Sequence, residues 1–287
     1  MESFESYRTY LFSIAYRMLG SAMDAEDMVQ ETYLRYQAAP PQTIHSLKAY
    51  LTTIIVRLCM DQLQLARRKR ELYVGAWLPE PILTEETPEE AADPEQRVEM
   101  EESISLAFLA LMEQLQPFER AVFLLREVFD YEFAEIATML EKNESACRRS
   151  FSRAKKHLVA QRPRFPPTPE THQRLLTSFL AAARGGDMTA LTNLLAENVT
   201  LWTDGGGKAR TATLRPIYGR AAVARISMKS QRFWPENTQF EFEEVNGQTT
   251  LVGRADGHAW MILAIEVEGE QIQRIRIIAN PDKLTRV

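Results

Sequence analysis

Two short helical segments joined by a polar break, at residues 131–158, constrain the fold of this chain more than any other stretch. Residues 133–140 carry apolar side chains at helical spacing, and Glu141-Lys142-Asn143 interrupts them. Asn143 is a suitable N-cap for the next helix because its side-chain oxygen can accept a free backbone N–H. That helix has apolar residues three or four positions apart, namely Cys147, Phe151, Ala154 and Leu158. The pattern predicts a helix-turn-helix.

The outward face of the second helix is strongly basic. Its polar residues are Arg148, Arg149, Ser152, Arg153, Lys155 and Lys156. Such a face alone is also typical of a surface helix whose cations only keep it soluble. Together with the preceding helix and the capped break, it favours a recognition helix in a DNA major groove, where Arg can fork onto a guanine edge. Glu141 departs from the usual pattern, since the turn often uses Gly there.

The formal net charge of −5 does not exclude DNA binding, because the acids are concentrated in one segment. Residues 80–102 hold ten acids against one base, so the rest of the chain carries +4. Counterion release from DNA depends on the local density of cations, and the total charge of the chain has little influence on it.

The 287 residues exceed one typical domain, and a hydrophobic content of 45% is sufficient for packed cores. The sequence has no run of about 18 apolar residues, and its start does not resemble a signal peptide. Cys59 and Cys147 fall on apolar helix faces, which fits core packing in a reducing compartment better than a disulfide or a metal site. We expect a cytoplasmic protein without a membrane span, a bound metal or a cofactor.

Residues 1–37 and 46–70 predict helices, with Gly20 ending the first. On the second helix we expect Met28, Tyr33 and Leu34 to pack, with Val29 at the edge. The polar residues of that helix form a separate face, which comprises Asp24, Glu26, Asp27, Gln30 and Glu31. Taken alone, acids in the first turns are explained by the helix dipole.

The helix at 46–70 ends in four consecutive cations, Arg67, Arg68, Lys69 and Arg70. Cations at a helix C-terminus favour the helix dipole, but a cluster of this density also marks a phosphate-binding surface. Its outer side also carries polar or aromatic residues, namely Tyr50, Arg57, Asp61 and Gln64.

Residues 76–102 form an acidic, Pro-containing linker, and we expect residues 1–75 and 103–160 to be separate helical domains. Trp77 is unusual in such a linker, and a Trp-Leu-Pro anchor is expected to dock somewhere; packing onto its own neighbours is the alternative. A Pro-rich spacer at 161–170 then precedes a third domain at 171–287. Its predicted helices are at 172–184, 188–197 and 219–230, and its predicted strands at 199–202, 239–245, 249–255, 259–267 and 271–278. Helices first and an antiparallel sheet last indicate an α+β fold.

The order of these elements resembles the extracytoplasmic-function sigma factors. The strings DAEDMVQET and AYLTTIIVRLCMD resemble sigma region two, and the helix-turn-helix resembles region four. Three further strings, WLPEP, DGGGK and NPDKL, resemble the SigJ-like group, which carries a C-terminal SnoaL-like domain. The resemblance implies a multidomain protein with two all-α sigma domains followed by an α+β SnoaL-like cone.

The resemblance also implies roles by position. The acidic face is expected to bind the β′ clamp helices of core RNA polymerase. The minus-ten element would be read by Tyr50, Arg57, Asp61, Arg67, Arg68, Lys69 and Arg70. Arg57 stands where many members have Asn. The minus-thirty-five element would be read by Arg148, Arg149, Ser152, Arg153 and Lys156. Inter-domain regulation is expected to involve Trp77, Leu78, Pro79, Asp204, Gly205, Gly206, Gly207, Lys208, Asn280, Pro281, Asp282 and Lys283.

The SnoaL-like cone hosts both enzymes and binding modules, so the fold does not decide its role. Asp204, Tyr218 and His258 are the residues that could serve an acid or base, with Trp202, Trp234 and Trp260 as pocket walls. Asp204 precedes three glycines, which suggests an exposed turn. We therefore expect a sigma factor, with no enzyme activity of its own, that its C-terminal domain regulates in cis. The alternative is a small-molecule-binding or catalytic SnoaL-like domain fused to a DNA-binding regulator.

Overall fold

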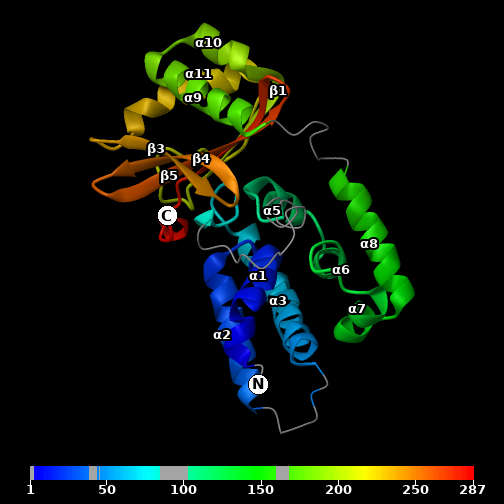
Figure 1. The fold of residues 1–287 in the computed structure, drawn as a ribbon. Coiled ribbons are helices and arrows are strands. Elements are labelled where there is room, and N and C mark those ends of the chain that lie inside the picture. The colour runs from blue at the N-terminus through cyan, green and yellow to red at the C-terminus, as the bar shows by residue number, and fades with distance from the viewer. Residues whose placement is uncertain (1–2, 39–43, 45, 85–102, 160–167) are drawn as a thin grey trace. The chain divides into compact units, whose positions relative to one another are not determined.

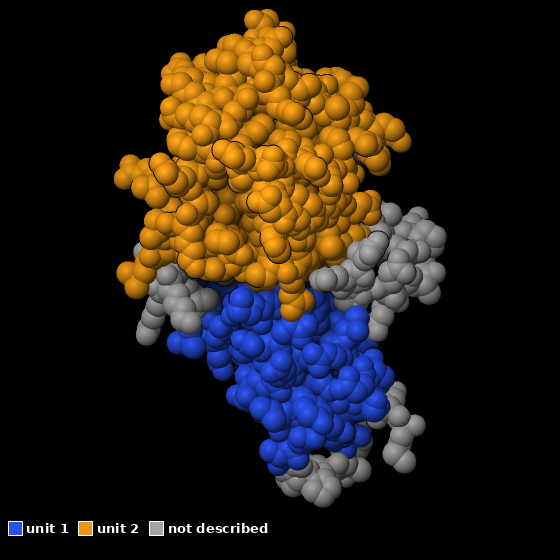
Figure 2. Space-filling model, turned by 90° about the vertical axis from the view of Figure 1, so that its left-hand side faces the viewer, with its two compact units in different colours: residues 1–71, 85–162 blue, residues 72–84, 163–287 orange. Residues whose placement is uncertain are grey.

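The computed structural model describes residues 3–38, 44, 46–84, 103–159 and 168–287. The chain divides into two compact units (Figure 2), and each is described by itself. Unit 1 comprises Met1–Glu71 and Glu85–Arg162, and unit 2 comprises Leu72–Thr84 and Pro163–Val287. The segment Leu72–Thr84 therefore groups with the C-terminal part of the chain, so the division falls before residue 72 and not at the expected boundary after 75.

The first helical group of unit 1 consists of η1 (Phe4–Tyr7), α1 (Arg8–Leu19), α2 (Ala22–Ala38) and α3 (Leu47–Glu71). Gly20 ends α1 in the left-handed conformation, with φ 66°. The buried residues of α2 are Ala22, Ala25, Val29 and Thr32. The expectation that Leu34 packs while Val29 lies at the edge was wrong, because Leu34 is exposed and Val29 is fully buried. The ring of Tyr33, which is partly exposed, packs against that of Phe4 with centroids 4.9 Å apart. Small residues spaced three and four apart allow α2 to lie close to α1 and α3, and this close approach decides the buried face.

The second helical group consists of α5 (Leu106–Met112), α6 (Pro117–Glu127), α7 (Phe133–Leu140) and α8 (Glu144–Val159). Pro117 is the first residue of α6, where its missing N–H costs no hydrogen bond. Glu141 ends α7 with φ 52°, so a glutamate adopts the left-handed conformation that Gly usually supplies. Asn143 Oδ1 accepts from Ala146 N at 2.7 Å, which confirms the predicted cap of α8.

Unit 2 contains a six-stranded sheet in the order β2-β1-β6-β5-β4-β3. Its strands are β1 (Leu195–Asp204), β2 (Ile217–Tyr218), β3 (Gln239–Val245), β4 (Gln248–Ala255), β5 (His258–Glu268) and β6 (Gln271–Ile278). The pair β1–β6 is parallel, and the other pairs are antiparallel. Figure 1 shows α9 (Pro169–Gly185), α10 (Met188–Leu194) and α11 (Arg220–Ser230) gathered on one face of this sheet. The short helices η3 (Gln231–Phe233) and η4 (Pro281–Lys283) complete the unit.

The helix predicted at 188–197 is shorter than expected. It ends at Leu194, and Leu195 already has extended backbone (φ −92°, ψ 137°) as the first residue of β1. Leu195 pairs with Ile272 of β6, and a register shift follows before Thr200. Pairing in the sheet therefore outweighs the helical preference of Leu195-Ala196-Glu197.

Candidate functional site

The acidic face on α2 is partly engaged within unit 1. Glu26 pairs with Arg8 at 3.0 Å, Glu31 pairs with Arg35 at 2.9 Å, and Asp24 accepts from Gln62 at 3.3 Å. Asp27 and Gln30 are exposed. The ion pairs are largely solvated, so an incoming partner could replace them at little cost.

The predicted minus-ten residues lie along α3. Tyr50 is half-buried and Asp61 is exposed. The side chains of Arg67, Arg68, Lys69 and Arg70, at the end of α3, lie outside the described residues.

Arg57 is held by the helix-turn-helix. Its Nε donates to the carbonyl oxygen of Met139 at 2.8 Å, and its guanidinium pairs with Glu141 at 2.9 Å. Met139 lies in the last turn of α7, where carbonyl oxygens lack helical partners. Local sequence patterns do not predict this contact, which joins residues 82 positions apart.

A buried polar network also joins the two helical groups. The hydroxyl of Tyr131 lies 2.8 Å from that of Tyr10 and 3.1 Å from that of Thr52. Arg17, fully buried, donates to Ser103 Oγ at 2.8 Å. Burial lowers the pKa of Arg17 to about 9, since removal from water disfavours the charged form. The second helical group is therefore fastened to the first by groups that would be costly to leave unpaired.

The basic face of α8 is exposed as predicted, and Cys147, Ala154 and Leu158 are buried beneath it. Several cations on this face contact neighbouring side chains: Arg148 pairs with Glu144, Arg153 pairs with Glu119 at 2.9 Å, and Arg149 donates to Ser145 Oγ at 2.7 Å.

Asp204, at the end of β1, is fully buried, which corrects the expectation of an exposed turn. Its carboxylate accepts four hydrogen bonds. The donors are Tyr73 OH at 2.5 Å, Leu78 N at 2.8 Å, Gly206 N at 3.1 Å and Lys283 Nζ at 2.8 Å. A buried carboxylate with this many donors is well compensated for its loss of water. Two of the donors belong to the segment Leu72–Thr84, so Asp204 is the point where that segment is fixed.

The strings DGGGK and NPDKL meet at this carboxylate. Asn280 Nδ2 donates to Tyr73 OH at 2.9 Å, and Lys208 pairs with Asp282 at 2.6 Å. Lys283 also donates to the carbonyl oxygen of Leu78 and lies 4.1 Å from the ring centre of Trp77. Burial, followed by the hydrogen bond to Asp204, raises the pKa of Tyr73, so the phenol remains a donor.

Glycine is required in this loop by space as well as by backbone conformation. Gly206 has φ 57°, and a Cβ there would lie 2.5 Å from Asn280 Nδ2. Gly207 has φ 74°, and a Cβ there would lie 3.1 Å from the Cβ of Val74. The three-glycine string therefore lets the loop approach both η4 and the docked segment closely.

The far end of the segment extends the contact to the β3–β4 turn. Ile82 N donates to Asn246 Oδ1 at 3.1 Å, and Asn246 N donates back to Ile82 O at 2.9 Å. Leu83 forms an antiparallel bridge with Val245. Leu78 and Ile82 are 3% and 1% exposed, so the segment Leu72–Thr84 is part of the fold of unit 2.

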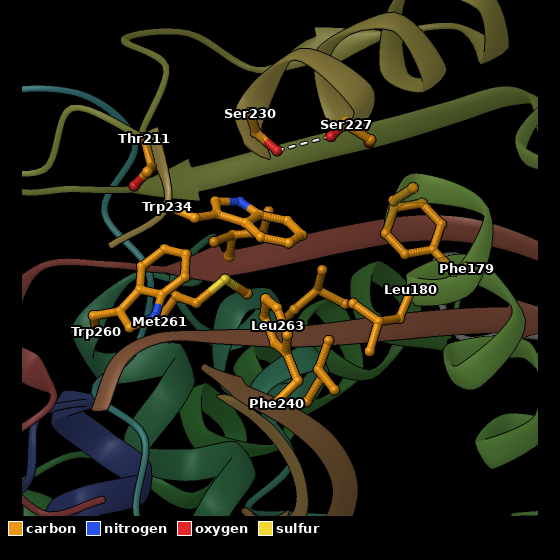
Figure 3. Close-up of a pocket in the computed structure, with 13 residues that line it drawn as sticks. Phe179, Leu180, Thr211, Ser227, Ser230, Trp234, Phe240, Trp260, Met261 and Leu263 are labelled. Carbon is orange, nitrogen blue, oxygen red and sulfur yellow. Dashed lines mark hydrogen bonds between the residues drawn. The ribbon is translucent and has the colours of Figure 1, made fainter. Parts of the chain in front are cut away.

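The candidate acid and base residues do not share a pocket. Tyr218 and His258 are exposed, and Asp204 is committed to the docked segment. A cavity elsewhere in unit 2 is lined by Trp234 and Trp260 (Figure 3), but none of its lining residues is charged. Among the described residues no cluster of His, Cys, Asp and Glu could hold a metal, and no helix is long and apolar enough to cross a membrane.

Comparisons with known proteins identify the family of this chain. The sigma-70 region 2 model matches residues 3–70, and the sigma-70 region 4 model matches residues 105–158. The ECF RNA polymerase sigma factor SigJ of Mycobacterium tuberculosis is 36% identical, over 99% of this chain and 93% of its own length. The chain belongs to the extracytoplasmic-function sigma factors. Such sigma factors bind core RNA polymerase and direct it to promoters, so this one acts in transcription initiation.

Two further comparisons cover nearly the whole sigma factor. The crystal structure of M. tuberculosis SigJ matches it with a TM-score of 0.75 and 33% identity, covering 99% of this chain and 97% of that one. The probable ECF sigma factor SigI of the same species is 29% identical over 98% of this chain and 93% of its own length. The C-terminal domain has the α+β fold that the sequence predicted, with helices on one face of a six-stranded sheet.

Proposed function

We propose that this sigma factor is regulated in cis, by the binding of its SnoaL-like domain to the segment Leu72–Thr84. The observation that carries the proposal is the buried carboxylate of Asp204, which accepts from Tyr73 and Leu78 on the segment. This segment directly follows α3, so it is the start of the connection between regions two and four. A domain that holds it can control how far the two regions separate.

Separation is needed because the two promoter elements are far apart. About 25 base pairs at about 3.4 Å each place them about 85 Å apart on straight DNA. In unit 1 the two regions touch, with Arg57 Nε 2.8 Å from the carbonyl oxygen of Met139. This arrangement corresponds to a sigma factor that is not reading both elements, and transcription requires that the contact open.

The site residues keep their expected roles within this proposal. The acidic face of α2 contacts core polymerase, α3 acts at the minus-ten element, and the outward face of α8 reads the minus-thirty-five element. The protein works in the cytoplasm with the polymerase. Its C-terminal domain acts as a regulatory module without catalysis, since no residue lining its cavity can serve as an acid or a base.

The test is transcription by core polymerase with full-length variants. Trp77→Ala removes the ring beneath Lys283, and Asp204→Asn removes the anionic acceptor. Both should change output in the same direction, and the double variant should differ from the sum because the residues act on one contact. Tyr218→Ala, on an exposed aromatic of β2, is the control. Loss of amide protection in Leu72–Thr84 without any change in transcription would refute the proposal.

A further inference from the structure

One aromatic ring in region four lies beneath an arginine of the outward face of α8. Phe133 is the first residue of α7, and the guanidinium carbon of Arg148 lies 4.6 Å from the centre of its ring. The guanidinium carbon of Arg126, on α6, lies 5.5 Å from the same centre. The side chain of Arg148 is nevertheless 59% exposed, so the ring supports the guanidinium without closing it off from a partner.

The ring of Phe133 is itself held in place by the core of region four. It meets the ring of Phe151 edge-on, with centroids 5.6 Å apart and an interplanar angle of 75°. Phe151 in turn stacks on Phe123 of α6, with centroids 5.9 Å apart. Rings packed in this way have little freedom to move, so Phe133 is a fixed surface on which the guanidinium of Arg148 lies.

Glu144 fixes the same guanidinium along one edge. Its Oε1 accepts from Arg148 Nε at 2.9 Å and also from Nη2. In the part of the chain that the structure describes, no hydrogen bond to Nη1 of Arg148 is present. The end of the guanidinium formed by Nη1 and Nη2 therefore keeps free N–H groups, and these match the O6 and N7 acceptors of guanine.

The neighbouring arginines of α8 are held differently. Arg149 donates to Ser145 Oγ at 2.7 Å, and Arg153 pairs with Glu119 at 2.9 Å. Among the described residues, neither guanidinium lies over an aromatic ring, whereas that of Arg148 does. Arg148 is thus fixed both across its plane and along one edge.

We propose that Phe133 and Glu144 are positioning residues for promoter recognition, which hold the guanidinium plane of Arg148 so that its free end meets a guanine of the minus-thirty-five element. A side chain that is already immobile loses less conformational entropy when it forms these two hydrogen bonds. Phe133 acts through Arg148 and not by its own contact with a base. The positioning role rests on the proposed reading of the minus-thirty-five element by α8.

The test compares Phe133→Leu, which keeps an apolar side chain, with Phe133→Tyr, which keeps the ring. Full-length protein bound to core polymerase is titrated on the target promoter, on promoters with each guanine of the minus-thirty-five element replaced in turn, and on a scrambled element. Phe133→Leu should lower the discrimination at one guanine by about two- to fivefold, the factor that an exposed cation–π contact is worth. Its affinity for the scrambled element and its salt slope should stay the same. Phe133→Tyr should discriminate as the unchanged protein does.

Glu144→Gln separates positioning from general electrostatics. It removes a negative charge beside the DNA, so affinity for the scrambled element should rise, while discrimination at the same guanine should fall. The double variant Phe133→Leu with Arg148→Ala should discriminate as Arg148→Ala alone does, because the ring has no effect without the guanidinium. Arg126→Gln, which removes the other cation over the ring, should leave discrimination unchanged.

The Nε–H signal of Arg148 in ¹⁵N spectra of the free full-length protein reports the geometry directly. The ring current of Phe133 shifts this signal, so it should move in Phe133→Leu and stay in place in Phe133→Tyr. Circular dichroism checks that each variant is folded, and Glu144→Gln decides the question if Phe133→Leu is not.

The outcomes distinguish the positioning role from the reading of the element. Unchanged discrimination in Phe133→Leu and Glu144→Gln, or equal weakening on all sequences, would overturn the positioning role while Arg148 remained a base contact. Unchanged discrimination in Arg148→Ala would overturn both the positioning role and the place of Arg148 in promoter reading.

Discussion

The ammonium nitrogen of Lys283 lies 2.8 Å from Oδ2 of Asp204, and their side chains are only 11% and 0% exposed. The same ammonium donates to the carbonyl oxygen of Leu78 and lies over the ring of Trp77. One buried ion pair thus joins three strings that are far apart in the sequence. Its strength should decide whether the segment Leu72–Thr84 stays docked.

Replacing Lys283 with Met should destabilise unit 2 by about 3–5 kcal/mol, because it leaves the buried carboxylate of Asp204 without its cation. Lys208→Met is the matched control. Its pair with Asp282 is 54% and 57% exposed, so its loss should cost about 1 kcal/mol or less. Urea unfolding followed by fluorescence measures both. Equal losses in the two variants would show that the buried pair has no special role.

Local patterns predicted much of the fold. The cap at Asn143, the stop at Gly20 and the strands at 239–245 and 271–278 follow from short-range chemistry that the sequence contains directly. The boundary at Leu195 could not be predicted in this way. Pairing with β6, more than seventy positions later in the chain, converts the end of a helical pattern into a strand.

The sequence predicted which residues belong to the candidate site around Asp204, but it did not predict their burial or their contacts. Three glycines after Asp204 suggested exposure, whereas the glycines are needed because Asn280 and Val74 approach the loop closely. Such approaches depend on tertiary packing and leave no periodic signal. The contact of Arg57 with Met139 could not be predicted for the same reason. Arg57 bonds to a backbone carbonyl oxygen, which every residue has, so the residue type at position 139 carries no signal.

Unit 2 should lose stability as the pH falls below about 6.5 because of His172. Burial lowers the pKa of His172 from its ordinary value of 6.5, and the ring bonds to the carbonyl oxygen of Ile265 at 3.1 Å. The unfolded chain therefore takes up this proton more readily than the folded one. The contribution is full above about 6.5 and is lost as the pH falls through the lower folded pKa.

Urea midpoints at pH 7.5 and pH 5 test this dependence. His172→Gln keeps a donor without titrating, so the fall in midpoint should be smaller in that variant. His157→Gln, on an exposed histidine of unit 1, should leave the fall unchanged. An identical fall in His172→Gln would assign the pH dependence to other groups.

Two substitutions on the outward face of α8 should distinguish a base contact from a phosphate contact at the promoter. Arg149→Ala should cost about 1–3 kcal/mol on the target promoter and relax sequence preference if the guanidinium forks onto a base. Lys156→Ala should weaken binding to all sequences alike and reduce the salt slope by about one unit. Titrations at several salt concentrations, on specific and scrambled minus-thirty-five sequences, distinguish the two. Equal losses on both sequences would make Arg149 a phosphate contact.

Core polymerase binding should depend on the acidic face of α2. Asp27 is exposed, so Asp27→Lys reverses its charge without disturbing the fold, and the double variant with Glu31→Lys should abolish co-purification with core polymerase. Glu236→Lys makes the same charge change as Asp27→Lys alone, on an exposed residue of unit 2, and should bind normally. Retained binding by the double variant would exclude this face from the polymerase interface.

The contact between Arg57 and Glu141 should restrain transcription. Glu141→Gln removes the carboxylate that lies 2.9 Å from the Arg57 guanidinium but leaves Arg57 available for DNA. The Arg57 and Glu141 side chains are 40% and 75% exposed, so the pair contributes at most about 1 kcal/mol. Loss of about 1 kcal/mol would favour the separation of region two from region four by up to about fivefold, so basal transcription by core polymerase should rise by up to the same factor.

The control for Glu141→Gln is Glu127→Gln, which breaks the pair with Lys155 at 2.9 Å inside region four. That change has the same chemistry but does not act between the regions, so basal transcription should stay the same. A donor and an acceptor dye on α3 and α8 would report the separation directly, with a lower transfer efficiency expected for Glu141→Gln alone. If neither transcription nor transfer efficiency differs between the two variants, the ion pair does not hold the regions together. The restraint would then rest on the buried network around Tyr131, which Tyr131→Phe would weaken by removing the hydroxyl shared with Tyr10 and Thr52.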